Sequence, residues 1–250
     1  MNKKRLRMFA GPNGSGKSTL KLMIEEEMPE KKLFGNYINP DEIEAEIKVT
    51  GLLDMKKYEI DPNEDEVINF FTTSSFLHQV QLTEKSYLLK YRDGKLFFDR
   101  VEINSYFASV AADFIRQNLL LLGKSFTFET VMSSRDKVDF FCKAKELGYR
   151  TYLYYVATDD SLINISRVAQ RSALGGHSVP EEKTKARYER SLALLMPAIR
   201  CANRSYIFDN SRHGIVAWIA EISDGKILEP KADEFPMWFK KVLEEKNHAP

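Results

Sequence analysis

Short apolar runs alternate with segments of helical periodicity along most of the chain. The run over residues 6–10 is followed by apolar positions that recur at helical spacing as far as Met28. Four more strands of this kind are expected, at residues 33–39, 125–129, 149–157 and 204–208. Helices are expected from Pro40 onward and at residues 104–122, 136–147, 161–172 and 181–195. Because strands that alternate with helices usually pair in parallel, the pattern predicts an α/β protein with a doubly wound parallel sheet.

The alternation is interrupted between residues 50 and 100. A polar turn at residues 61–66 opens a short helix, and Asp93-Gly94 separates two apolar segments in the manner of a β-hairpin. A hairpin does not belong to a parallel sheet, so residues 50–100 are expected to form an insertion within a single domain of residues 1–250. The tail, residues 226–250, is expected to hold a proline turn and then a short charged helix.

Composition narrows the classes of function. Of the 250 residues, 43% are apolar, which is enough for a packed core, and the net charge is +1. A chain so close to neutral implies no nucleic-acid partner, and no apolar run reaches the length of a membrane span. Cys142 and Cys201 have no metal-binding or C-x-x-C spacing, so they are expected to be reduced thiols in the core of a cytoplasmic protein.

A glycine-rich segment that reads G-x-x-x-x-G-K-S joins the first strand to the first helix. This is the Walker A pattern, or P-loop, in which backbone N–H groups and a helix N-terminus hold phosphate oxygens. Lys17 is expected to bind the β and γ phosphates of ATP, and the Ser18 hydroxyl to bind Mg²⁺. A glycine turn that only caps the helix is the alternative. The expected nucleotide-binding residues are Gly11, Pro12, Asn13, Gly14, Ser15, Gly16, Lys17, Ser18 and Thr19.

Acidic residues follow two of the expected strands, at the sheet edge where ligands of such folds bind. Asp41 is either a first-turn acid that the helix dipole favours or the base that takes a proton from an acceptor hydroxyl. Glu129 either caps the following turn or binds the acceptor, beside the hydroxyls of Thr130 and Ser133.

A third acid, Asp209, comes at the end of the last expected strand. Asp-Asn-Ser is a common turn sequence, so a structural role is one explanation. The other is that Asn210 borders the adenine of the nucleotide.

Arginines recur on two helices that flank a Gly-Gly break. Arg167 and Arg171 lie four residues apart, and Arg187 and Arg190 lie three apart, so each pair shares a helix face. Solvated helix faces are one explanation. The other is a mobile lid whose arginines neutralise the transferring phosphoryl group, with His177 at its tip as a further donor to the substrate.

Together these segments resemble the zeta toxin family, and more closely its free-standing, ATPase-like branch. The resemblance covers most of the chain outside residues 50–100 and the tail. It is carried by Gly11–Thr19, Asn39–Ile43, Phe128–Thr130, Gly148–Tyr149, Arg167–Arg171 with Gly175–Pro180, and Asp209–Ser211.

The resemblance implies a P-loop kinase fold with strand order 2-3-1-4-5. The best-known members of the family transfer phosphate from ATP to the 3′-hydroxyl of the N-acetylglucosamine in UDP-N-acetylglucosamine, and an antitoxin protein is the partner that the family implies. Carried over by motif, Lys17 binds phosphate, Asp41 is the base and Glu129 holds the acceptor sugar. Arg167 contacts the transferring phosphate from the lid helix.

The chain departs from the best-known toxins at three places. His177 stands where those toxins have a second lid arginine, for which Arg171 is the nearest substitute. Thr130-Val131 stands where they have Gly-Thr, and residues 50–100 lie between the base and the acceptor strand. The expected function is an ATP-dependent kinase of a small hydroxyl acceptor. The alternatives are a P-loop ATPase or nucleotide-gated switch that works with a protein partner, and a toxin-derived binding protein whose catalysis is lost.

Overall fold

The computed structural model describes residues 4–28, 33–173 and 179–245. The chain divides into two compact units, one of residues 1–35 with 127–250 and the other of residues 36–126. The predicted insertion, residues 50–100, lies within the second unit. Among the described helices, none is both long and apolar enough to cross a membrane.

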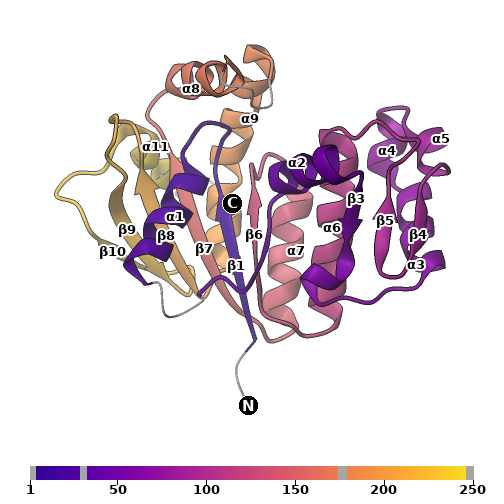
Figure 1. Cartoon of the computed structure of the whole chain (residues 1–250). Helices are drawn as coiled ribbons and strands as arrows, with labels where there is room; N and C mark the ends of the chain where they lie inside the picture. Colours follow the sequence, from indigo (N-terminus) through magenta and orange to yellow (C-terminus); the bar gives the residue numbers. More distant parts are fainter. Residues whose placement is uncertain (1–3, 29–32, 174–178, 246–250) are drawn as a thin grey trace. The chain divides into compact units, whose positions relative to one another are not determined.

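The first unit is built on a mostly parallel sheet (Figure 1). Its strands lie in the order β10-β9-β8-β7-β1-β6, and the pairings of β1 with β7 and of β7 with β8 are parallel. The strands are β1 (Arg5–Ala10), β6 (Phe126–Thr130), β7 (Arg150–Ala157), β8 (Arg204–Asp209), β9 (Ala217–Ser223) and β10 (Ile227–Pro230). The prediction of an α/β protein with a central parallel sheet is therefore confirmed, and the architecture agrees with a P-loop kinase fold.

Helices pack on both faces of this sheet. Neighbouring residues of a strand point to opposite faces, and in β7 Tyr154 packs with Phe9 of β1 and Leu20 of the first helix. Tyr155 instead contacts Ser191 and Trp238, from two later helices. The helices of this unit are α1 (Lys17–Glu27), α7 (Arg135–Glu146), α8 (Ser161–Ala173), α9 (Glu181–Ala193), α10 (Leu195–Cys201) and α11 (Met237–Glu245).

The sequence did not indicate the last two strands of the sheet, β9 and β10, which run antiparallel to their neighbours. β9 pairs antiparallel with both β8 and β10, and β10 lies in the tail, where the sequence was expected to supply only a turn and the helix that is present as α11. The segment that joins β8 to β9 covers only residues 210–216. A parallel crossover needs about a dozen residues or more, whereas antiparallel neighbours can be joined by a short turn. The short connection therefore sets the direction of β9.

The prediction of two reduced thiols is also wrong. Cys142 of α7 and Cys201 at the end of α10 form a disulfide, with their Cα atoms 4.8 Å apart. The two cysteines are 59 residues apart in sequence. The sequence holds no spacing signal for such a pair, because only the packing of α7 beside α10 brings the two side chains together.

Breaking this disulfide is expected to lower the stability of the protein. A cross-link that closes a long loop restricts the unfolded chain, and its loss typically costs about 2–4 kcal/mol. Thermal unfolding of the Cys142→Ser variant should therefore occur at a lower temperature than that of the oxidised wild type. Dithiothreitol should lower the wild-type midpoint toward that of the variant and leave the variant unchanged. Equal sensitivity of both proteins to the reductant would contradict the assignment.

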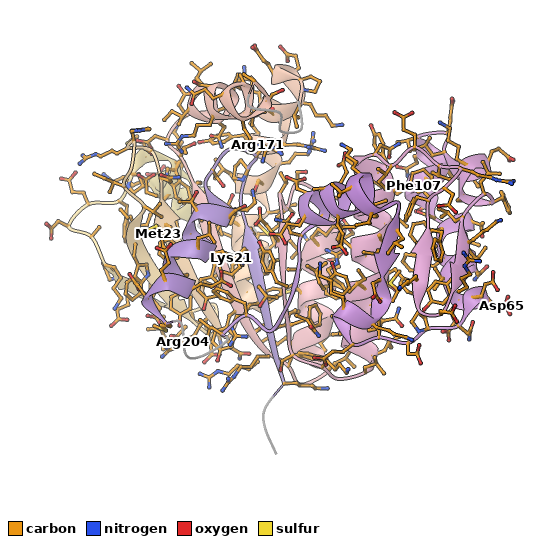
Figure 2. The ribbon with its side chains drawn as sticks, viewed as in Figure 1. Lys21, Met23, Asp65, Phe107, Arg171 and Arg204 are labelled. Atoms are coloured by element: carbon orange, nitrogen blue, oxygen red, sulfur yellow. A yellow bond between two sulfur atoms is a disulfide. The ribbon has the colours of Figure 1, made fainter. Side chains whose placement is uncertain are left out.

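The second unit combines helices with a three-stranded antiparallel sheet in the order β3-β5-β4. The predicted hairpin is confirmed: β4 and β5 pair across Asp93 and Gly94, whose φ angles of 52° and 79° suit a type I′ turn. Phe107, labelled in Figure 2, is fully buried with Phe71 and packs against Phe98. The elements are β2 (Asn36–Ile38), α2 (Pro40–Thr50), β3 (Leu52–Asp54), the 3₁₀ helix η2 (Met55–Tyr58), α3 (Glu64–Thr72), α4 (Ser75–Gln79), α5 (Thr83–Ser86), β4 (Lys90–Arg92), β5 (Lys95–Phe97) and α6 (Ser105–Leu121).

Candidate functional site

The glycine loop between β1 and α1 has a backbone conformation that residues with a Cβ could not adopt at its glycine positions. Gly11, Gly14 and Gly16 have φ angles of 143°, 71° and 97°, which L-residues rarely adopt. A Cβ on Gly11 would lie 2.0 Å from the carbonyl oxygen of Val156, and one on Gly16 would lie 2.2 Å from Nδ2 of Asn210. The loop is therefore shaped by glycines and enclosed by the ends of neighbouring strands.

Two side chains that follow the loop meet the same carboxylate. The buried Lys17 Nζ donates to the carbonyl oxygens of Gly11 and Pro12, both at 3.0 Å, and lies 4.0 Å from Glu129 Oε1. The Ser18 hydroxyl donates to Glu129 Oε1 at 3.2 Å and Oε2 at 3.1 Å. Glu129 is the fourth residue of β6, the strand beside β1. The loop thus holds an ammonium, a hydroxyl and a carboxylate within a few ångströms.

The residues of the loop fit a phosphate chain and a magnesium ion. Ser15 Oγ is buried and has no hydrogen-bond partner among the described residues, although buried hydroxyls are normally paired. A bound polyanion would accept a hydrogen bond from the unpaired donor and would neutralise the buried cation. It would also occupy the space that a Cβ in place of a glycine hydrogen would fill. The hydroxyl of Ser18 and the carboxylate of Glu129 are hard oxygen donors of the kind that Mg²⁺ prefers.

Side chains from other elements fix the tip of the loop. Asn164 of α8 donates from Nδ2 to the carbonyl oxygen of Asn13 at 2.6 Å, while its Oδ1 accepts from the Thr158 hydroxyl. Arg187 of α9 donates from Nη1 to Oδ1 of Asn13 at 3.4 Å. The sequence did not point to Asn164, because an asparagine within a helix is not by itself a signal of a loop contact.

The predicted nucleoside-side residue also holds the loop. The buried Asn210 donates from Nδ2 to the carbonyl oxygen of Ser15 at 2.8 Å. Its own carbonyl oxygen accepts from Arg167 Nη1 at 2.9 Å. Asn210, which follows β8, and Arg167, which lies in α8, therefore lie together beside the start of α1.

The turn around Asn210 is anchored by the last helix. Asp209 Oδ1 accepts from the Ser211 hydroxyl at 2.7 Å and from Trp238 Nε1 at 2.9 Å. The Trp238 backbone N–H donates to Asp159 Oδ1 at 3.3 Å. Trp238 was predicted only as part of the tail. In the structure its two hydrogen bonds connect α11 to the residues that follow β7 and end β8.

Two hydroxyls anchor α9 near the carboxyl end of β7. The Tyr188 hydroxyl donates to the carbonyl oxygen of Thr158 at 2.6 Å, and Ser191 lies 3.1 Å from the Tyr155 hydroxyl. Burial raises the pKa of the Tyr188 phenol, and the carboxylates of Asp159, Asp160 and Asp209 raise this pKa further. The phenol is therefore a stable neutral donor at physiological pH, and α9 has a fixed position on the sheet.

The residues expected around the acceptor differ in their hydrogen bonds and in their exposure. Thr130 Oγ1 accepts from the Met132 backbone N–H at 3.0 Å, so this hydroxyl stabilises the turn. The carbonyl oxygen of Ser133 accepts from Arg190 Nε at 3.1 Å. Arg171 lies exposed in the last turn of α8, above the strand ends (Figure 2), and His177 lies outside the described residues. Thr19 is exposed in the first turn of α1.

Asp41 belongs to the second unit and lies exposed in the first turn of α2. Asn39 caps this helix, because its Oδ1 accepts from the Asp41 backbone N–H at 2.9 Å. Pro40 occupies the first helical position, which suits its fixed φ. The local sequence thus sets the backbone of Asp41.

The fold of the chain is similar to that of known proteins of low sequence identity. No family model and no curated protein matches the chain. A chain of the AvrRxo1-ORF1:-ORF2 complex solved with ATP shares 14% identity and a TM-score of 0.56, with 98% of this chain and 63% of that chain covered. The native complex has 14% identity, a TM-score of 0.57 and coverages of 96% and 63%. This chain therefore spans less than two thirds of the length of these neighbours, and at such identity the likeness extends to the fold alone.

The PezAT toxin-antitoxin system of Streptococcus pneumoniae is a weaker structural match. It has 15% identity and a TM-score of 0.45, with 99% of this chain and 85% of that chain covered. A similarity of this size adds no argument about function. The likeness of fold therefore rests on the AvrRxo1 neighbours.

Proposed function

We propose that the protein is an ATP-dependent phosphotransferase that phosphorylates a hydroxyl group of a small molecule. The observation that carries this proposal is the convergence of Lys17, Ser18 and Glu129 at a loop whose backbone requires glycine at three positions. An ammonium, a magnesium-binding hydroxyl and a carboxylate are the groups that P-loop enzymes use around the terminal phosphates of a nucleotide. The AvrRxo1 complex solved with ATP is in agreement with this choice of nucleotide.

The loop residues bind and orient the donor. Backbone N–H groups of residues 13–16 and the N-terminus of α1 bind the phosphate oxygens, and Lys17 neutralises charge on the β and γ phosphates. Ser18 and Glu129 are the side chains that would hold magnesium, which adds positive charge where the transferring phosphoryl group becomes most negative. The bonds between Ser18 and Glu129 favour this metal role for Glu129 over the acceptor role that the resemblance implies.

The acceptor side supplies a base. We assign this role to Asp41, which takes the proton as the acceptor oxygen bonds to the γ-phosphorus. The bond from that phosphorus to the bridging oxygen breaks, and the oxygen leaves on ADP with the electron pair. An Asp at a helix N-terminus is a weak base, which is sufficient because this reaction depends mainly on position and charge neutralisation. Arg167 and Arg171 are assigned to the phosphates, and Thr130, Ser133 and His177 to the acceptor.

UDP-N-acetylglucosamine is the acceptor to test first, because it is the one that the resemblance implies. The protein should be incubated with ATP, Mg²⁺ and this sugar nucleotide, and in parallel with a metabolite extract and γ-labelled ATP. A product heavier by one phosphoryl group in either reaction is expected by mass spectrometry. ATP consumption without any phosphorylated small molecule would contradict the proposal.

A nucleotide-gated switch is the second candidate. The neighbours from the AvrRxo1 system were solved as a complex of two proteins, which favours a protein partner for this chain as well, such as an antitoxin. ATP hydrolysis that rises on addition of a partner protein, with no phosphorylated small molecule, would support this candidate over the kinase.

A further inference from the structure

Arginines of α8 and α9 lie beside different residues of the glycine loop. Arg187 contacts Asn13, and Arg167 contacts Asn210, which in turn binds Ser15. The sequence placed these arginines together on a lid with one shared task. The contacts instead distinguish two positions along the loop.

The contact of Arg187 lies next to the loop residues that hold the Lys17 ammonium. Lys17 Nζ donates to the carbonyl oxygens of Gly11 and Pro12, and Pro12 immediately precedes Asn13. The ammonium that serves the β and γ phosphates is therefore next to the residue that Arg187 touches. The bond from Arg187 to the neutral Asn13 amide is long, at 3.4 Å, and a phosphate oxygen is a stronger acceptor for a guanidinium.

Arg167 instead contacts Asn210, the residue beside the last part of the loop. Asn210 binds the carbonyl oxygen of Ser15 and lies against Gly16, immediately before α1 begins. This helix start cradles the inner phosphates, to which the nucleoside is attached. Arg167 therefore lies beside the part of the nucleotide that ATP and ADP have in common.

The helix that carries Arg187 is held in a fixed position. Tyr188, the next residue, is buried and bonds to the carbonyl oxygen of Thr158, and Ser191 pairs with the buried Tyr155 one turn later. A charged group acts best in catalysis when its supporting element is rigid and its position is set in advance. Arg187 meets this condition without any lid movement.

We propose that Arg187 is the arginine that neutralises the γ-phosphoryl group during transfer, and that Arg167 binds the inner part of the same nucleotide. The inference rests on the proposed function and specifies which residue supplies the positive charge. It also accounts for His177 at the place of a toxin lid arginine, because Arg187 supplies the charge from α9.

Binding of two nucleotides separates the roles of the two arginines. Calorimetry with Mg²⁺ and either ADP or a non-hydrolysable ATP analogue measures both affinities for each variant. Arg187→Met should lower the affinity for the ATP analogue by about tenfold to a hundredfold, the effect of losing a hydrogen bond between charged groups, and leave the ADP affinity unchanged. Arg167→Met should weaken both nucleotides by the same factor. The transfer rate of Arg187→Met should fall by about 10³-fold or more.

Arg190→Met is the matched control, since Arg190 lies on the same helix and contacts Ser133 instead of the loop. It should keep the wild-type ratio of the two affinities. Arg187→Gln also removes the charge and should show the same affinities as Arg187→Met. Agreement between the two variants shows that the result does not come from a folding defect of one of them. Equal weakening of both nucleotides by Arg187→Met, or of neither, overturns the inference while the kinase proposal stands. A wild-type protein that binds no nucleotide overturns both.

Discussion

Replacing Lys17 by methionine is expected to lower kcat/KM for phosphoryl transfer by about 10³-fold, the upper range for removing one donor that stabilises transition-state charge. Methionine is similar in length but carries no charge, so the substitution removes the cation that serves the β and γ phosphates. The Lys17 side chain is buried and its ammonium is held by Gly11 and Pro12, which means that it is oriented before the nucleotide arrives. Initial rates at several ATP concentrations measure the effect.

Lys21→Met is the matched control for this experiment. Lys21 lies on the same helix (Figure 2) and forms an ion pair with Glu25 at 3.1 Å. Its loss should change the stability by no more than about 0.5 kcal/mol, the usual size of a surface i,i+4 pair, and leave transfer intact. Comparable rates for Lys17→Met and the wild type would show that the ammonium does not act on the phosphates.

Local sequence signals predicted the loop and its flanking elements. Gly11, Gly14 and Gly16 are required where the backbone adopts left-handed φ values, and such a need is visible in sequence as a glycine pattern. The hairpin at Asp93-Gly94 was predictable for the same reason, and the cap at Asn39 follows from the local preference for asparagine before a helix. Each of these features depends on residues that are close together along the chain.

Features that depend on packing between distant segments were not predictable from one sequence. Asn164 and Arg187 reach Asn13 across 151 and 174 residues, and Trp238 reaches Asp209 across 29. The disulfide and the antiparallel β9 are further examples, since both follow from which elements lie side by side. The bonds between Ser18 and Glu129 belong to the same class, because they require β6 to lie next to β1.

The role of the lid arginines shows how far residue spacing can be used. Spacing correctly placed Arg167 and Arg171 in one helix and Arg187 and Arg190 in the next. Spacing alone could not indicate which arginine contacts which residue, since all four side chains carry the same charge. That distinction comes from the acceptor atoms of Asn210, Asn13 and Ser133.

Replacing Asp41 by asparagine is expected to lower kcat by about 10²-fold to 10⁴-fold, the usual contribution of a general base. Asparagine keeps the size of the side chain, and the bond from the residue 41 backbone N–H to Asn39 Oδ1 does not depend on the carboxylate. The loss of a first-turn acid costs the helix only about 0.3–1 kcal/mol. Affinity for the ATP analogue should remain at the wild-type value, because the glycine loop and Lys17 are unchanged.

Glu42→Gln supplies the comparison that isolates the base. Glu42 is also an exposed acid in the first turn of α2, so its neutralisation changes the net charge and the helix dipole as Asp41→Asn does. A base acts only through a proton that it can reach, whereas a dipole or field effect acts through either carboxylate. A loss of rate in Asp41→Asn alone therefore identifies the Asp41 carboxylate as the group that takes the proton. Equal losses in both variants would mean that the effect comes from the change in charge. A wild-type rate for Asp41→Asn would reject Asp41 as the base.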